Sequence, residues 1–126
     1  MMKVSQVAAD TISVGGRDVS FGQKIVDVVV LSDRVIINLC VDDFPKDRKF
    51  DGRNIVCLGS DGAVLWVIED SGARIKGKFG SDMPQGYFNL WRTADTGDLR
   101  VDNIDWTYDL DPKTGRVSNP RSLRSL

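Results

Sequence analysis

Residues 24–41 read KIVDVVVL, then Ser32 and Asp33, then RVIINLCV. Valine and isoleucine dominate both runs, and these β-branched residues favour extended strands. A Ser-Asp pair between two such runs is typical of a two-residue hairpin turn. If that turn sets the register, three apolar pairs share one face of the hairpin, which we expect to be core: Val30 with Val35, Val28 with Ile37, and Val26 with Leu39.

The opposite face of this hairpin has a different composition. It places Asp27 opposite Asn38, alongside Val29 and Ile36. Because polar and apolar side chains share this face, we expect it to be mixed and partly exposed to water.

The rest of the chain repeats the same pattern of short apolar runs and turn residues. A Gly15-Gly16 turn joins 11–14 to 17–21, and all acidic residues except Glu69 are aspartates, which favour turns over helices. A chain of 126 residues that is 41% hydrophobic fits one globular domain. We therefore predict an all-β, antiparallel meander of about nine or ten strands, a small sandwich or a barrel-like bent sheet. The domain should span residues 1–118, and residues 119–126 should be a frayed tail.

Three segments refine this prediction. Residues 54–58 and 63–68 are apolar on both faces, so their hairpin should form the middle of the fold. Residues 73–79 alternate, with a basic outer stripe, and lead into a loop at 80–85. Residues 104–110 alternate again. Four large side chains should point inward, namely Ile104, Trp106, Tyr108 and Leu110. The outward residues Asp105, Thr107 and Asp109, with Asp111 next in line, should form an acidic stripe.

Composition argues against several classes of function. The formal net charge of -1 provides no basic field for nucleic acid or an anionic membrane. The sequence contains no histidine and two cysteines, which removes imidazole-based catalysis and zinc binding and leaves no disulfide framework. No apolar run is long enough for a signal peptide or a membrane span, so we expect a cytoplasmic protein. Residues 109–120 lack the glycine and glutamate positions of a calcium loop, and we expect no metal and no cofactor.

One motif allows a catalytic hypothesis. The segment Asp70-Ser71-Gly72-Ala73 resembles the active-site loop of retroviral-type aspartic proteases, and Asp95-Thr96-Gly97 repeats the motif. The resemblance implies a homodimer in which two copies of Asp70 share a proton. Glu69 stands where that family has an apolar residue, and the same residue types are those that hairpin turns require.

A second resemblance covers more of the chain. Residues 54–68, NIVCLGSDGAVLWVI, and 106–117, WTYDLDPKTGRV, are similar to blade repeats of quinoprotein-type β-propellers. Similar segments also occur in small bacterial all-β proteins of unassigned function. The resemblance implies antiparallel strands but no quinone cofactor, since one closed propeller needs at least about four blades of about 40 residues.

These observations favour a non-enzymatic interaction module that binds another protein through a charged face and the loop at 42–53, and the acidic face would suit a basic partner. A specific form is an immunity or antitoxin partner of a bacterial toxin. The alternatives are the homodimeric aspartic protease, with Asp70 as its catalytic residue, and a β-barrel that binds a small ligand. The expected partner-binding residues are five aspartates: Asp42, Asp43, Asp105, Asp109 and Asp111.

Overall fold

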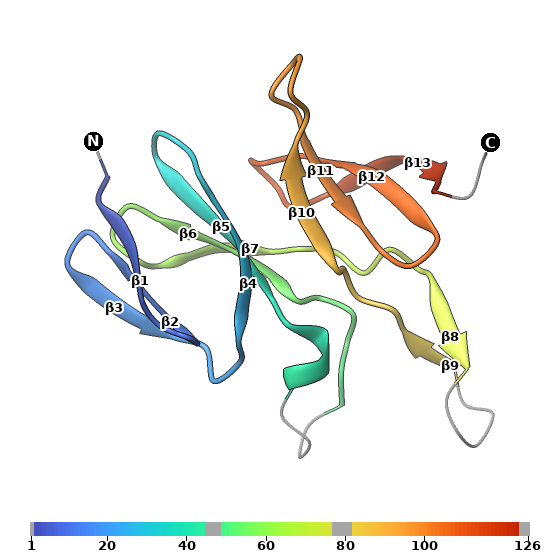
Figure 1. The fold of residues 1–126 in the computed structure, drawn as a ribbon, viewed down its shortest axis with the longest axis horizontal. Coiled ribbons are helices and arrows are strands. Elements are labelled where there is room, and N and C mark those ends of the chain that lie inside the picture. The colour runs from blue at the N-terminus through green and yellow to red at the C-terminus, as the bar shows by residue number, and fades with distance from the viewer. Residues whose placement is uncertain (1, 45–48, 77–81, 124–126) are drawn as a thin grey trace.

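The structure is a computed structural model that describes residues 2–44, 49–76 and 82–123. The described residues form thirteen strands in four antiparallel sheets, and each sheet runs in chain order (Figure 1). The all-β, antiparallel prediction is confirmed, with more and shorter strands than expected. The sheets are open and none closes into a barrel, so the barrel alternative lacks its enclosed interior. No helix in the described part of the chain is long and apolar enough to cross a membrane.

The elements divide into an amino-terminal sheet, a central sheet, a two-stranded ribbon and a carboxy-terminal sheet. The amino-terminal sheet contains β1 (Val4–Ala8), β2 (Thr11–Val14) and β3 (Arg17–Ser20). The central sheet contains β4 (Ile25–Val30), β5 (Arg34–Leu39), β6 (Ile55–Gly59) and β7 (Val64–Val67), with the short 3₁₀ helix η1 (Val41–Asp43) after β5. The ribbon contains β8 (Arg74–Lys76) and β9 (Asp82–Pro84). The carboxy-terminal sheet contains β10 (Asn89–Arg92), β11 (Leu99–Asp102), β12 (Trp106–Leu110) and β13 (Val117–Ser122).

The β4–β5 hairpin forms at the predicted Ser-Asp turn. Val30 pairs with Val35 as expected, but a bulge near the start of β4 places Ile25, instead of Val26, opposite Leu39. The expectation that the whole face is core is wrong for β4. Val26 and the other two predicted β4 core valines are each more than a third exposed, whereas their neighbours on β5 are buried. The amino-terminal sheet packs over β5, β6 and Ile25 at the start of β4, and it leaves the three valines further along β4 uncovered.

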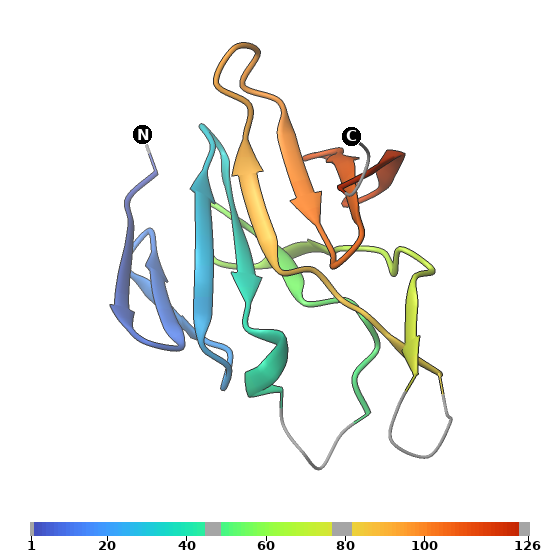
Figure 2. The same ribbon diagram turned by 45° about the vertical axis from the view of Figure 1, so that its right-hand side comes forward.

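The opposite face of the hairpin is more deeply buried than the sequence suggested. Ile36 and Asn38 have no exposed surface, and Ile36 belongs to a core cluster shared with β10, β11 and β12. The carboxy-terminal sheet therefore covers the face that we expected to be partly wet. Figure 2 shows β10 running alongside the β4–β5 hairpin, and contacts between β4 and β10 agree with that placement.

The asparagine side chain of Asn54 links these two sheets. Its amide nitrogen lies 2.9 Å from Asn38 Oδ1 and 2.8 and 2.7 Å from the carbonyl oxygens of Leu39 and Tyr87, so its two hydrogens are shared among three acceptors. Its amide oxygen accepts the backbone N–H of Tyr87 at 2.8 Å. Asn54 is 3% exposed, so these polar groups satisfy one another without bulk water.

The carboxylate of Asp27 in β4 binds β10, the edge strand of the carboxy-terminal sheet. It accepts hydrogen bonds from Asn38 Nδ2 at 2.9 Å and from the backbone N–H of Leu90 at 3.0 Å. The guanidinium of Arg92 also donates to the carbonyl of Val30 at 3.2 Å. The polar pair that suggested a wet surface is thus a junction between sheets.

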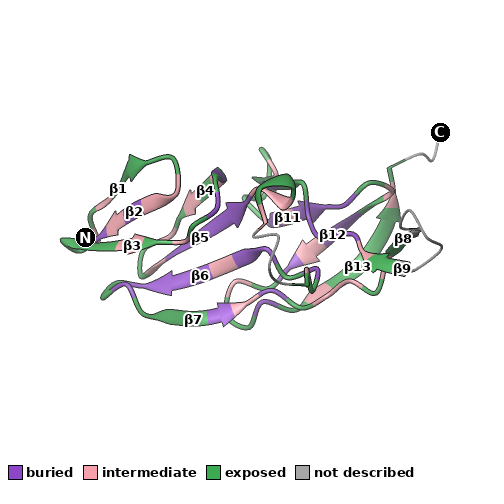
Figure 3. Ribbon diagram, turned by 90° about the horizontal axis from the view of Figure 1, so that it is seen from below, coloured by how far each residue is buried: buried purple, intermediate pink, exposed green. Residues whose placement is uncertain are grey.

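The centre of the fold is β5 and β6, which are largely buried (Figure 3). The predicted middle hairpin 54–68 is central only in its first strand, because β7 is the edge of the sheet and Val64 and Leu65 are exposed. The predicted loop at 80–85 includes β9, which pairs with β8. The part of the expected basic stripe at residues 77–79 lies outside the described residues.

Two expectations for the carboxy-terminal region need correction. The tail from residue 119 is not frayed as far as Ser122, because β13 pairs with β12 along that stretch. The alternation of 104–110 also fails at its start, where Ile104 lies in the turn before β12 and is exposed. Trp106, which we expected in the core, is also exposed and is not part of the core cluster. Thr107, which we expected on the outer stripe, is buried.

Candidate functional site

The carboxy-terminal sheet has one apolar and one polar face. Leu90, Val101 and Tyr108 lie in the core, so their strand neighbours point away from it. Strand pairing sets Trp91 opposite Arg100. We call this polar side the outer face, defined by Asn89, Trp91, Arg100, Asp102, Thr107, Asp109 and Arg121.

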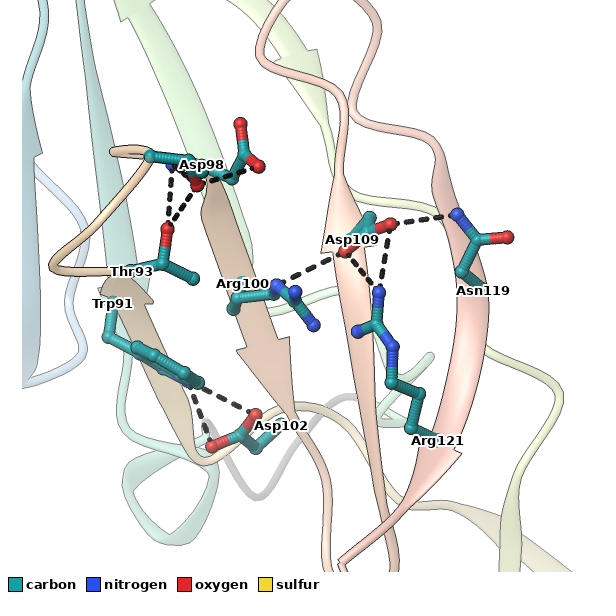
Figure 4. A network of polar contacts seen from close by, with 9 residues as sticks. Trp91, Thr93, Asp98, Arg100, Asp102, Asp109, Asn119 and Arg121 are labelled. Atoms are coloured by element: carbon teal, nitrogen blue, oxygen red, sulfur yellow. Dashed lines mark hydrogen bonds and ion pairs between the residues drawn. The ribbon is translucent and has the colours of Figure 1, made fainter.

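The outer face presents a tryptophan held by a carboxylate (Figure 4). Trp91 Nε1–H lies 3.2 and 3.1 Å from the two carboxylate oxygens of Asp102. Asn89 Nδ2 donates to the same carboxylate at 3.3 Å. Trp91 is 41% exposed and Asp102 is 8% exposed. The indole is therefore fixed by its N–H edge while much of its surface remains open to solvent.

Beside the tryptophan, a carboxylate bridges two arginines across three strands (Figure 4). Asp109 Oδ1 lies 3.1 Å from Arg100 Nε and 3.1 Å from Arg121 Nη2. Asn119 Nδ2 donates to the other oxygen of Asp109 at 2.8 Å. Because one carboxylate serves two guanidinium groups, their side chains are ordered before any ligand arrives.

The turn between β10 and β11 extends this polar network. Thr96 Oγ1 donates to Asp98 Oδ2 at 2.8 Å, and the backbone N–H of Asp98 donates to Thr93 Oγ1 at 3.1 Å. Asp95 accepts the backbone N–H of Thr96 at 2.9 Å. This Asp-Thr-Gly copy therefore serves as a hydrogen-bonded turn whose aspartates are exposed.

The five predicted partner-binding aspartates do not form one surface. Asp109 lies on the outer face, but Asp105 precedes β12 in a turn. Asp111 lies in the turn after β12, where its carboxylate accepts the backbone N–H of Lys113 at 2.9 Å. The neighbouring carbonyl of Pro112 accepts a bond from Arg34 at 3.0 Å, which places this turn beside the β4–β5 turn.

Asp42 and Asp43 lie at the other end of that hairpin, in η1 after β5. Asp43 Oδ2 accepts the backbone N–H of Lys24, just before β4, at 2.7 Å. Both aspartates line a cavity of about 550 Å³ together with Asp10 and Cys40. The structure thus separates the 42–43 pair from Asp109 and Asp111.

Asp70 occupies a tight turn after β7. Its carboxylate accepts the backbone N–H of Gly72 at 2.9 Å and forms an ion pair with Arg74 at 2.9 Å. It also lines a cavity of about 340 Å³ with Asp51 from the 42–53 loop. The hydrogen bond to Gly72 and the ion pair are those of a turn residue and provide no support for the protease alternative.

Burial raises the pKa of the Cys57 thiol to about 11. Burial also raises the pKa of the Tyr87 hydroxyl, which donates to the carbonyl of Glu69 at 2.7 Å. Both groups belong to the core and remain protonated at neutral pH. Among the described residues, no group of three or more acidic or cysteine side chains is arranged to hold a metal ion.

Sequence reasoning found Asp109 but missed most of the outer face. Arg121 was assigned to a frayed tail, and Asp102 carries no motif. The available signal was the alternation of 89–92 with 99–102, which places Trp91 among polar neighbours.

Comparison with known proteins gives one match. No curated protein and no solved structure matches the chain significantly. The model of a family described as a domain of unknown function, DUF7957, matches residues 1–122. This match includes every element described above, from β1 to β13. The chain therefore belongs to the DUF7957 family.

Proposed function

We propose that this protein is a non-enzymatic interaction module that binds a partner protein through the outer face. The observation that carries the proposal is the exposed indole of Trp91, fixed by Asp102 beside an ordered ion network. Tryptophan and arginine are enriched among the residues that dominate protein–protein binding energies. An exposed tryptophan beside arginines on a polar sheet face is therefore a suitable anchor residue for a partner protein.

The ordered network supports the same proposal through entropy. Binding usually costs free energy because flexible interface side chains lose rotamer freedom. Here Trp91 and the arginines bound to Asp109 already have intramolecular partners. A ligand would therefore meet a surface whose long side chains need little further ordering.

The proposal is tested with two tryptophan variants of the full chain. Trp91 and Trp106 are 41% and 40% exposed, but they lie on opposite faces of the same sheet. Wild-type protein, Trp91→Ala and Trp106→Ala are immobilised, and proteins retained from native-cell extract are quantified by mass spectrometry. Direct binding of each retained candidate to the three proteins is then measured.

The expected partner binds wild type and Trp106→Ala similarly but binds Trp91→Ala about 30-fold more weakly, the loss typical of an anchor residue. Circular dichroism confirms that both variants are folded. A set of partners unaffected by Trp91→Ala, or equally affected by both variants, contradicts binding through the outer face.

A finer form of the proposal is an immunity- or antitoxin-type protein. Its support is the small size of 126 residues and the slightly acidic net charge, which suit a diffusible inhibitor of a basic toxin. The test is co-expression with the product of the neighbouring reading frame in the source genome. Growth rescue by wild type but not by Trp91→Ala supports this form, and absence of toxicity or rescue contradicts it.

A further inference from the structure

The exposed part of Trp91 is its aromatic ring, not its hydrogen-bond donor. The indole N–H already points to both oxygens of Asp102, at 3.2 and 3.1 Å. An indole ring carries negative potential on its faces and positive potential at its edge. Because the N–H edge is occupied by a carboxylate, the indole has no hydrogen-bond donor left for a ligand, and its remaining attraction for polar groups is that of the negative ring faces for cations.

The carboxylate of Asp102 strengthens this preference. Asp102 is 8% exposed, and its hydrogen-bond donors are the neutral groups of Trp91 and Asn89. No basic side chain in the described part of the chain forms an ion pair with it. Arg100 lies on the same face but pairs with Asp109, so the largely buried Asp102 carboxylate has no direct ion-pair partner there, attracts positive charge and disfavours an approaching anion.

The surrounding charges have the same bias. Arg100 and Arg121 both pair with Asp109, so their charge is partly neutralised. In contrast, Asp95 and Asp98 in the turn between β10 and β11 are exposed. They accept hydrogen bonds from the backbone N–H and the hydroxyl of Thr96, and neither forms an ion pair among the described residues. These turn carboxylates therefore retain more of their charge than the arginines do, which adds to the negative charge at this end of the sheet.

From this arrangement we infer that Trp91 seats an arginine or lysine side chain of a basic partner protein, with Asp102 supplying the complementary charge. A cation over an indole face is attracted by the ring itself, and tryptophan is the best of the aromatic side chains for this contact. This inference rests on the proposed function and names the chemistry of its partner. It moves the expected basic contact from the separated aspartates to the Trp91 side of the outer face.

The test follows the indole N–H signals of uniformly ¹⁵N-labelled protein during titration. The probes are N-acetyl-arginine amide, its neutral isostere N-acetyl-citrulline amide, N-acetyl-glutamate amide and maltohexaose. The Trp106 indole signal is an internal control, because that ring is equally exposed on the opposite face. The same titrations are run on Asp102→Asn, which keeps a hydrogen-bond acceptor, and on Asp98→Asn, whose exposed site tolerates substitution.

The arginine amide is expected to shift the Trp91 signal with about two- to five-fold higher affinity than the citrulline amide, the range of an exposed cation–π contact. Asp102→Asn should reduce this preference more than Asp98→Asn does, because Asp102 contacts the indole, and added salt should also reduce it. Trp106 should not respond. Equal affinities for arginine and citrulline, or a preference unchanged in both variants, overturn the inference.

Two further outcomes also overturn it. One is a Trp91 signal moved by maltohexaose or the glutamate amide but not by the arginine amide, which would assign the ring to a saccharide or an acidic ligand. The other is a Trp91 signal that no probe moves. The capture experiment with Trp91→Ala and Trp106→Ala tests the proposed function independently. A partner whose binding requires Trp91 but does not change in Asp102→Asn or with added salt would contradict this inference and still support the proposed function.

Discussion

Replacing Asn54 with alanine should show how strongly the two large sheets depend on one buried amide. Asn54 connects β5 and the segment before β10 through four hydrogen bonds of 2.7–2.9 Å. In Asn54→Ala, the N–H and carbonyl of Tyr87, the carbonyl of Leu39 and the amide oxygen of Asn38 all lose this partner. The site is 3% exposed, so water does not readily replace the lost groups.

The magnitude follows from the groups left unsatisfied. Each buried polar group without a partner costs about 1–3 kcal/mol, and partial rearrangement of the carbonyl contacts reduces the sum to about 3–5 kcal/mol. Typical domains unfold with a free energy of about 5–15 kcal/mol, so the loss is a large share of the total. Asn54→Asp should also be destabilising, because it keeps the oxygen but removes the donors to Leu39 and Tyr87.

Urea denaturation followed by circular dichroism and tryptophan fluorescence measures these losses. The matched control is Asn89→Ala, at an exposed residue, which removes one long, part-buried hydrogen bond of 3.3 Å to Asp102 and should cost less than about 1 kcal/mol. If Asn54→Ala is no more destabilising than Asn89→Ala, the amide does not join the sheets energetically and the reasoning is refuted.

Three other perturbations have defined outcomes. In thermal denaturation, Gly115→Ala should destabilise the fold by about 1–3 kcal/mol more than Gly97→Ala. Both glycines have φ near +75°, but only at Gly115 would a Cβ lie 2.5 Å from the Trp66 ring. Equal losses would show that the turn at Gly115 does not pack on Trp66. Burial raises the Cys57 pKa from 9.0 to about 11, so the thiol ionises at lower pH in the unfolded chain than in the folded one. The unfolding free energy should therefore fall as the pH rises from 9 to about 11. Cys57→Ala should flatten this dependence of stability on pH, and an unchanged dependence would assign it to other groups. Asp109→Asn should cost about 1–2 kcal/mol, because it leaves two guanidinium groups without their shared carboxylate; chemical denaturation showing no loss would mean that solvent already screens the network.

Part of the outer face could be read from the sequence, and part could not. The alternation of polar and apolar residues in 106–110 placed Asp109 on the side of the strand away from the core, where the structure has it half-buried. Its pairing with Arg100 and Arg121 was not predictable, because strand order and the extent of β13 decide which basic residues lie beside it. Trp91 acquired its orientation through Asp102, a partner on the next strand.

The sequence by itself determined the antiparallel class and several turns, because β-branched runs and short turn motifs act within a few residues. Gly15-Gly16 and Ser32-Asp33 form the two-residue turns that their chemistry favours. Tertiary structure decided which sheet faces became core. Val28 remained exposed while Asn38 was buried, because burial depends on which distant strand covers each face, and no residue type specifies that alone.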